Sequence, residues 1–178
     1  VALATALDYV RVIGKTPIVV NDSRGFFANR CVLRFTAEGL EMLMEGVPPA
    51  MAENTAKMAG MPVGPLSLSD EVALDLVLKI MKATEADLGP NAINPDQKKL
   101  MVELVEKQGR LGRKNSKGFY DYPEKGKGQK SLWPGLSALQ PKQLDPDTLD
   151  IEELKQRFLV VQAVEAARTV EDHVITDP

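Results

Sequence analysis

The side chain with the clearest chemical potential in this sequence is an amide, that of Asn29. It lies four residues before Leu33, on the apolar stripe of a predicted helix and one turn inside its start. A buried amide without a hydrogen-bond partner costs about 1–3 kcal/mol, so Asn29 should meet either the protein or a ligand. Two interpretations stay open: Asn29 ties the helix to a neighbouring strand end, or it faces a cleft and binds a ligand.

No residue of the chain is a convincing general base. The single histidine, His173, lies at the end of the last predicted helix, where exposure and the helix dipole favour a cation. The single cysteine, Cys31, cannot form an internal disulfide and is expected to act as a small hydrophobic residue within a helix. We therefore predict no catalytic residue and no metal ligand in this chain.

A basic, glycine-rich stretch at residues 110–130 raises the possibility of phosphate binding. The pattern Gly-x-x-x-x-Gly-Lys-Ser/Thr is absent, however, and no helix start follows the glycines. The Gly-x-Gly-x-x-Gly of dinucleotide sites is absent as well. The stretch is predicted to be a solvated loop in which residues 119–122 pack as a short extended piece.

The elements that would position Asn29 follow from the pattern around it. A β-branched run at residues 18–20 predicts a short buried strand, although a lone strand has no sheet to join. Asp22 or Ser23 is placed to cap a helix that begins near Gly25 and runs to Val47.

That helix carries a charged stripe opposite its apolar one. The stripe should face water, and Arg34 could pair with Glu38 four residues further on. Its members are Arg30, Arg34, Glu38, Glu41 and Glu45.

The rest of the chain is typical of helices joined by turns. Helices are predicted over residues 1–13, 49–59, 67–88, about 95–106, and 150–172, with capping boxes at Ser67-x-x-Asp70 and Asp150-x-x-Glu153. Residues 131–149 contain three prolines and are predicted to be a surface linker that Trp133 and Leu136 anchor. The predicted fold class is an all-α helical bundle with one short N-terminal strand.

Composition excludes several classes of function. A net charge of −3 does not give the positive surface that binding to nucleic acid or to an anionic membrane requires. No apolar run approaches the roughly 20 residues that a membrane span needs. The first 13 residues lack the basic start and apolar core of a signal peptide, so a reducing, cytoplasmic compartment is the default expectation.

Three blocks of sequence resemble blocks of one protein family and occur in the same order as in that family. They are residues 22–30 (DSRGFFANR), 60–75 (GMPVGPLSLSDEVALD) and 112–122 (GRKNSKGFYDY). The chain resembles the helical C-terminal domain of the 3-hydroxyacyl-CoA dehydrogenases. Arg24 replaces a proline common in the monofunctional enzymes, and this resembles the multifunctional fatty-acid oxidation proteins, in which an enoyl-CoA hydratase precedes the dehydrogenase.

The last predicted helix also repeats part of the sequence pattern of the helix that begins near Gly25. The alignment that sets Arg157 against Arg30 also sets Glu165 against Glu38 and Val174 against Val47. Multifunctional relatives carry two tandem copies of this helical domain. The resemblance therefore implies four segments: residues 1–21 as a remnant of a nucleotide-binding domain, 22–130 as copy one, 131–149 as a linker, and 150–178 as the first helix of copy two.

The apolar face of that last helix would then need a partner, either copy one or a neighbouring chain. The residues on this face are Phe158, Val161, Val164 and Val170.

The resemblance further implies a reaction, the NAD-dependent oxidation of L-3-hydroxyacyl-CoA to 3-ketoacyl-CoA in fatty-acid β-oxidation. In the family the catalytic histidine, its glutamate and the NAD site belong to the nucleotide-binding domain, so this fragment alone is expected to be inactive. Asn29 would bind the C3 oxygen of the acyl-CoA substrate. Leu33 and Leu66 or Leu68 would line the acyl path, unless these leucines only pack in the core.

Homodimerisation through the helical domain is also expected from the resemblance. Two alternatives remain: a stand-alone helical interaction module derived from such an enzyme, and a related dehydrogenase that acts on a different small hydroxy acid.

Overall fold

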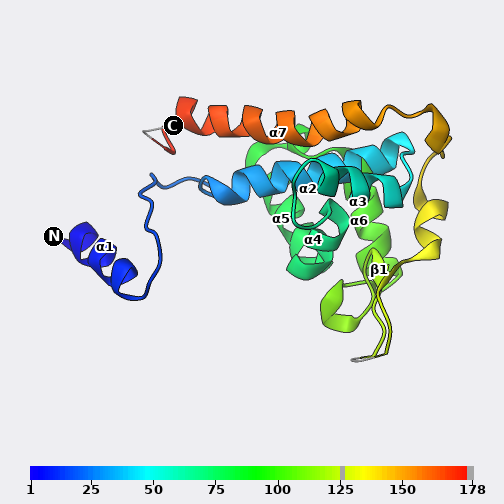
Figure 1. Ribbon diagram of the computed structural model, residues 1–178, viewed down its shortest axis with the longest axis horizontal. Helices are drawn as coiled ribbons and strands as arrows, with labels where there is room; N and C mark the ends of the chain where they lie inside the picture. Colours follow the sequence, from blue (N-terminus) through cyan, green and yellow to red (C-terminus); the bar gives the residue numbers. More distant parts are fainter. Residues whose placement is uncertain (125–126, 176–178) are drawn as a thin grey trace.

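The computed structural model describes residues 1–124 and 127–175 and shows an all-α protein with one very short hairpin (Figure 1). The helices are α1 (Ala2–Val12), α2 (Ala28–Glu45), α3 (Pro49–Met58), α4 (Pro65–Val72), α5 (Leu74–Leu88), α6 (Pro95–Val102) and α7 (Ile151–Glu171). The hairpin pairs β1 (Tyr120–Asp121) with β2 (Ser131–Leu132) in antiparallel register. The all-α prediction is confirmed.

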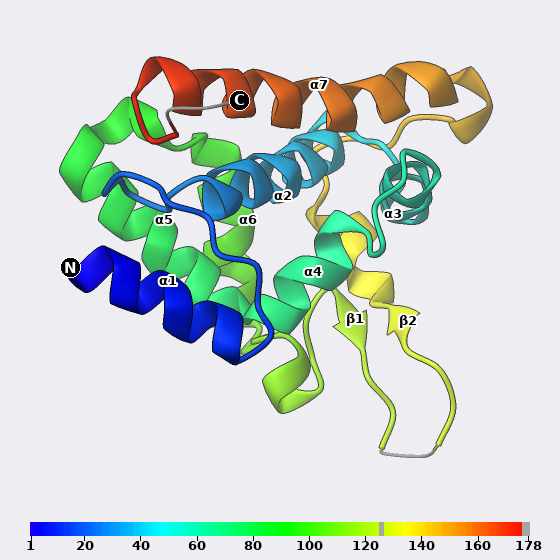
Figure 2. The same cartoon turned by 60° about the vertical axis from the view of Figure 1, so that its left-hand side comes forward.

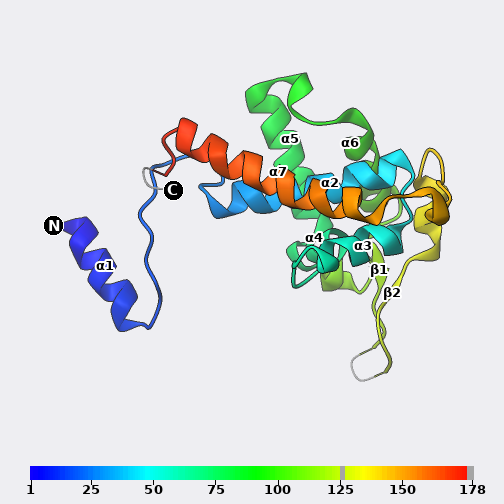
Figure 3. The same cartoon turned by 45° about the horizontal axis from the view of Figure 1, so that its top comes forward.

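Two apolar clusters lie on opposite sides of α2. The larger one joins α2 to α4, α5, α6 and the hairpin, and it includes Leu40, Leu66, Leu78, Leu104 and Phe119. The smaller one joins α2 to α3 and α7. In it the rings of Phe35 and Phe158 lie 5.2 Å apart, so α7 covers the face of α2 that the larger cluster leaves open (Figures 1 and 3). Because Gly39 carries no Cβ, α2 can approach Pro65 of α4 closely.

The N-terminal part differs from the sequence prediction. The predicted helix forms as α1, but none of its residues is buried, and it stands apart from the other helices (Figures 1 and 3). Residues 15–20 form no strand, and Ile18 and Val19 are 71% and 56% exposed. A strand needs a neighbour to satisfy its backbone groups, and no strand lies beside this segment in the described part of the chain.

The start of α2 also differs from the prediction. Gly25 and Phe26 adopt positive φ angles of 77° and 50° in a turn, so the helix begins at Ala28 rather than near Gly25. Neither Asp22 nor Ser23 caps it, because the N-cap residue is Phe27 and no side chain caps there. The helix ends at Glu45 with Gly46 in the left-handed C-cap conformation, two residues before the predicted end at Val47.

The single helix predicted over residues 67–88 is two helices. The chain breaks at Ala73, whose φ of 86° ends α4 and starts α5. The capping box at Ser67-x-x-Asp70 is wrong, because α4 begins at Pro65 and Asp70 points into the interior. The helices predicted near residues 49–59 and 95–106 form as α3 and as α6 with a following π turn at Glu103–Lys107.

Replacing Ala73 with glycine should stabilise the protein. An L-residue at a positive φ is strained by about 1–3 kcal/mol, and glycine removes that strain at a smaller cost in chain entropy. We expect the free energy of unfolding to rise by about 1 kcal/mol and the melting temperature by about 2–4 °C in a thermal unfolding experiment.

Ala83→Gly is the matched control for Ala73→Gly. Ala83 is exposed in the middle of α5, where glycine should lower stability by about 0.8–1 kcal/mol. Equal destabilisation by both substitutions would show that Ala73 carries no strain.

The basic stretch at residues 110–130 is more ordered than the sequence predicts. Arg110 is 6% exposed, stacks over Trp133 at 4.1 Å, and donates hydrogen bonds to the carbonyls of Gly118 and Tyr120. The predicted extended piece forms as β1, and Lys125 lies outside the described residues. Arg110 therefore works as an internal support for the hairpin, not as a phosphate ligand.

The predicted anchors of the surface linker and the cap of the last helix are both confirmed. Leu136 is buried in the larger cluster, and Trp133 packs beside it. The Asp150 side chain accepts hydrogen bonds from the backbone N–H groups of Glu152 and Glu153 at the start of α7. None of the helices described here is both long and apolar enough to cross a membrane.

Candidate functional site

Asn29 lies in the first turn of α2, directly after the strained turn at Gly25 and Phe26. Figure 2 shows α2 lying beside α7. Its side chain is exposed, and it makes no hydrogen bond to any residue of the described ranges 1–124 and 127–175. The interpretation that Asn29 ties α2 to a strand end is therefore not supported. The amide is free to meet a ligand.

The leucines predicted beside it divide into two kinds. Leu33, one turn along α2, is 39% exposed, and Leu68 is half-buried beside the smaller cluster. Leu66 is completely buried in the larger cluster. Of the three, only Leu33 and Leu68 have surface that a ligand could touch. Phe26, three residues before Asn29 in the chain, is a further apolar side chain that is 48% exposed.

Four of the five residues in the charged stripe of α2 pair with charges of α7 or its C-terminal end rather than face only water, which corrects the prediction. The fifth, Glu41, accepts hydrogen bonds from the side chains of Asn94 and Gln97 instead. The two helices run antiparallel, and each offers an arginine to two carboxylates of the other (Figure 3). Arg30 Nε lies 2.7 Å from Glu165 Oε1, and its Nη1 lies 2.8 Å from Asp172 Oδ2. The predicted Arg34–Glu38 pair does not form, because α7 supplies better-placed partners: Arg34 contacts Glu165.

The second half of this interface repeats the first with the helices exchanged. Arg157 Nε of α7 lies 2.6 Å from Glu38 Oε1, and its Nη1 lies 2.5 Å from Glu45 Oε2. The alignment that sets Arg157 against Arg30 also sets Glu165 against Glu38 and Asp172 against Glu45. The two arginine clusters are thus related by an approximate two-fold axis between α2 and α7.

The helix ends obey the same relation. Gly46 and His173 both have positive φ, 97° and 55°, and each precedes a buried valine. The N–H of Val47 donates to Met42 O at 2.9 Å, and the N–H of Val174 donates to Thr169 O at 2.8 Å. His173 is exposed and serves as a helix-end residue, as predicted.

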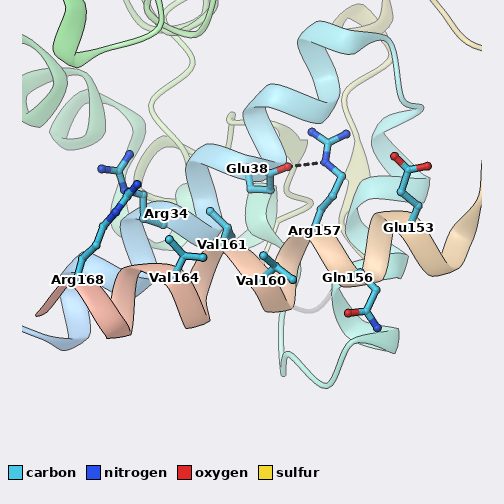
Figure 4. Close-up of a pocket in the computed structure, with 9 residues that line it drawn as sticks. All are labelled: Arg34, Glu38, Glu153, Gln156, Arg157, Val160, Val161, Val164 and Arg168. Atoms are coloured by element: carbon cyan, nitrogen blue, oxygen red, sulfur yellow. Dashed lines mark hydrogen bonds and ion pairs between the residues drawn. The ribbon is translucent and has the colours of Figure 1, made fainter. Parts of the chain in front are cut away.

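A groove of about 490 Å³ runs along the outer side of this helix pair (Figure 4). Val160, Val161 and Val164 form its apolar wall, Gln156 lies along one edge, and Arg34 and Arg168 approach each other at one end. The two-fold relation sets Gln156 against Asn29 and Val160 against Leu33. The groove is therefore the counterpart, on α7, of the surface around Asn29.

The apolar face predicted for α7 has a partner over part of its area. Phe158 is fully buried, and its ring packs against Phe35 of α2, so α2 supplies this contact. Val164 and Val170 are 44% and 36% exposed.

Two buried carboxylates, whose role as internal acceptors the sequence did not predict, hold the hairpin against α3 and α4. Asp70 is 0% exposed and accepts hydrogen bonds from the N–H groups of Phe119 and Tyr120 and from the Tyr122 hydroxyl. Burial raises the pKa of Asp70 despite these donors.

Glu53 is the second of these carboxylates. Glu53 lies in α3 and is 2% exposed. Its carboxylate accepts hydrogen bonds from the N–H of Leu66 in the first turn of α4 at 2.7 Å and from the Tyr120 hydroxyl at 2.7 Å. Both carboxylates have their acceptors filled by the protein, so their role is structural. Among the described residues no group of histidine, cysteine and acidic side chains is placed to hold a metal ion.

Glu165 gives the α2–α7 interface a dependence on acid. Burial raises the pKa of Glu165, but hydrogen bonds and charge from Arg30 and Arg34 outweigh burial and leave the pKa below its usual 4.5; Arg168 Nη1 lies 3.5 Å away as a third cation. The stabilisation is therefore complete above about pH 4.5 and is lost as the pH falls through the lowered pKa.

Thermal unfolding of the protein and of Glu165→Gln between pH 7 and pH 3 should show this loss. We expect the difference in melting temperature to be constant above about pH 5 and to shrink below pH 4.5, because glutamine does not titrate. A difference that is independent of pH would mean that folding does not change the pKa of Glu165, and therefore that Arg30 and Arg34 do not stabilise its charge.

Comparison with known proteins shows which family this chain resembles. Residues 25–122 match the family described as 3-hydroxyacyl-CoA dehydrogenase, C-terminal domain. The fatty acid oxidation complex subunit alpha of two Vibrio cholerae O1 strains is 36% identical over 174 residues, which cover 97% of this chain and 23% of that protein. The chain therefore spans less than a quarter of the length of these curated relatives.

Two solved structures have a similar fold. The dehydrogenase part of multifunctional enzyme 1 from C. elegans superposes with a TM-score of 0.65 over 99% of this chain and 39% of that one, at 23% identity. The (S)-3-hydroxybutyryl-CoA dehydrogenase from Ralstonia eutropha gives a TM-score of 0.54 over 68% of this chain and 42% of that one, at 30% identity. The chain belongs to the family of the 3-hydroxyacyl-CoA dehydrogenase C-terminal domain.

Proposed function

We propose that this chain is the substrate-side helical part of an NAD-dependent L-3-hydroxyacyl-CoA dehydrogenase of fatty-acid β-oxidation. The observation that carries the proposal is the exposed amide of Asn29, which has no partner among the described residues and lies inside the segment that matches the family. The exposed Leu33 lies one helical turn further along α2, and the exposed Phe26 lies three residues before Asn29 in the chain. An amide beside apolar surface suits the C3 oxygen and the acyl chain of the same substrate.

The role of Asn29 is to donate a hydrogen bond to the C3 oxygen. Negative charge develops on this oxygen as alcohol and ketone interconvert, and a donor already in place stabilises that charge. Leu33 and Leu68 would contact the acyl chain, whereas Leu66 would support them from the core.

The residues of this chain do not fit NAD themselves. The sequence has no Gly-x-Gly-x-x-Gly, and in the described part of the chain the only sheet is the two-residue hairpin, so there is no strand-to-helix turn on which a pyrophosphate could bind. We therefore assign NAD, together with the catalytic histidine and glutamate, to a nucleotide-binding domain outside this chain. Residues 1–21 would be its last helix and connecting segment, which explains why α1 buries nothing here.

The two-fold relation between α2 and α7 supports the proposed segments. Residues 22–130 would be copy one, 131–149 a linker, and 150–178 the start of a second copy. The repeated arginine clusters and helix ends are what two copies of one helix would give. The exposed valines of α7 would then be covered by the rest of copy two.

Further features follow from the same family assignment. The similarity to fatty acid oxidation subunit alpha supports a fused enoyl-CoA hydratase, and we propose a cytoplasmic enzyme that pairs through its helical domain. A stand-alone interaction module is the alternative that the exposed apolar faces of α1 and α7 favour.

The test is NADH-dependent reduction of acetoacetyl-CoA by two proteins: this chain, and a longer protein in which its natural upstream sequence of about 200 residues precedes it. Activity only in the longer protein is expected. Activity of the chain alone would contradict the assignment of the NAD site, and inactivity of both would favour the interaction module.

A further inference from the structure

The segment that carries Asn29 has little structure of its own. Among the described residues, the turn between Asp22 and Ala28 has one internal backbone hydrogen bond, in which the N–H of Phe26 donates to Ser23 O at 3.0 Å. Gly25 and Phe26 hold positive φ angles, and no side chain caps the helix that follows. A turn of this kind keeps its shape only if neighbouring elements hold its ends.

The C-terminal end of α7 holds both of those ends. Before the turn, the Asn21 side-chain amide donates to His173 O at 2.7 Å, and the Asn21 N–H donates to Val174 O at 2.8 Å. After the turn, Arg30 is fixed by Glu165 at 2.7 Å and by Asp172 at 2.8 Å. The only other ion pair of the turn in the described chain joins Arg24 to Asp87 of α5, and both of those side chains are about half exposed.

Burial makes the Glu165 contact the strong one. The Glu165 side chain is 4% exposed and that of Arg30 is 16% exposed, so water competes little for this pair. Arg30 follows Asn29 directly in the chain, and a shift of the Arg30 backbone therefore moves the Asn29 amide with it. Asp172 is 57% exposed and contributes less.

We propose that Glu165, assisted by Asp172, is a positioning residue for Asn29. The helix that begins the second copy thereby fixes the substrate-side amide of the first copy without touching the substrate. The kinetic part of this inference rests on the proposed dehydrogenase function, whereas the structural part does not.

The molecule supplies its own matched control. Glu38 holds Arg157 at 2.6 Å in the symmetry-related cluster, with side-chain exposures of 18% and 25%. Glu38→Gln removes the same kind of ion pair from the same pair of helices, but one that does not hold the residue next to Asn29. Both substitutions keep the shape of the side chain and remove its charge.

The experiment uses the longer protein and measures two quantities for each variant. The backbone amides of Asn21, Phe26 and Cys31 donate hydrogen bonds at the two ends of the turn and within it. Their hydrogen exchange should become at least about tenfold faster in Glu165→Gln and stay unchanged in Glu38→Gln. With acetoacetyl-CoA and NADH, kcat and kcat/KM should fall together by about 10- to 100-fold in Glu165→Gln and by less than about twofold in Glu38→Gln.

Each outcome decides a separate point. Equal kinetic losses in both variants, or unchanged exchange at the amides of Asn21, Phe26 and Cys31 in Glu165→Gln, would overturn the positioning role. If the unsubstituted longer protein has no activity, the proposed function fails, and the exchange experiment still decides whether Glu165 holds the turn.

Discussion

Replacing Asn29 with alanine should lower kcat of the longer protein by about 10²–10³-fold, the loss typical of removing one donor to a developing oxyanion. kcat and kcat/KM should fall together, because the hydrogen bond gains strength only as charge develops. The Asn29 side chain is exposed and has no partner among the described residues, so stability should hardly change. The measurement is steady-state reduction of acetoacetyl-CoA, together with a thermal unfolding curve for each protein.

Gln156→Ala provides the control for Asn29→Ala. Gln156 is an exposed amide that occupies the symmetry-related position on α7. Gln156→Ala should change kcat by less than about twofold. The Gln156 amide is not expected to meet an oxygen on which charge develops, so its removal should not change the energy of the transition state. A large loss in Gln156→Ala, or a loss below about tenfold in Asn29→Ala, would contradict the role of Asn29.

Replacing Asp70 with alanine should destabilise the fold by about 3–5 kcal/mol, the largest effect on stability that we expect of a polar residue here. Three donors lose their acceptor at once: the N–H groups of Phe119 and Tyr120 and the Tyr122 hydroxyl. Each buried donor left unpaired costs about 1–3 kcal/mol. Chemical denaturation of this chain measures the loss.

The neighbouring residue Glu71 provides the control for Asp70. Its ion pair with Arg113 is exposed, with side-chain exposures of 41% and 64%, so Glu71→Ala should cost less than about 1 kcal/mol. Similar losses in the two variants would mean that Asp70 is not the buried acceptor that the structure shows.

Local signals were predictable from the sequence where the physical cause is itself local. Asp150 caps α7 because its own side chain reaches the next two N–H groups. The end of α2 follows from the left-handed freedom of Gly46. The same reasoning failed for Asp70, because its partners lie about 50 residues further along the chain, and a capping box and a buried acceptor look alike in sequence.

Tertiary contacts decided the remaining differences. In the sequence, the charged stripe of α2 looks like a water-facing surface, but in the structure α7 brings complementary charges to it. The only sign of this in the sequence was the repeat that aligns Arg157 with Arg30. The run at residues 18–20 has the composition of a strand but meets no partner strand here. The break between α4 and α5 at Ala73 could not be predicted, because the sequence has no turn-forming residue there. A strained alanine occupies a position with positive φ at which glycine would be favoured.

The free amide of Asn29 was predictable only as one of two alternatives. Spacing placed it on the apolar stripe, but whether that part of the stripe is covered depends on where the other helices end. In the structure Leu40 and Leu43 are covered by the larger cluster, whereas Leu33 and Asn29 extend beyond it.

The most direct test of the account is a hydrogen-exchange footprint of acetoacetyl-CoA on the longer protein. We predict protection at residues 25–33, around Asn29 and Leu33, and none at residues 152–160, the symmetry-related segment of α7 that carries Gln156. Protection at residues 152–160 instead, or no protection of either segment at saturating ligand in an active enzyme, would contradict the claim that the N-terminus of α2 is the substrate-side surface.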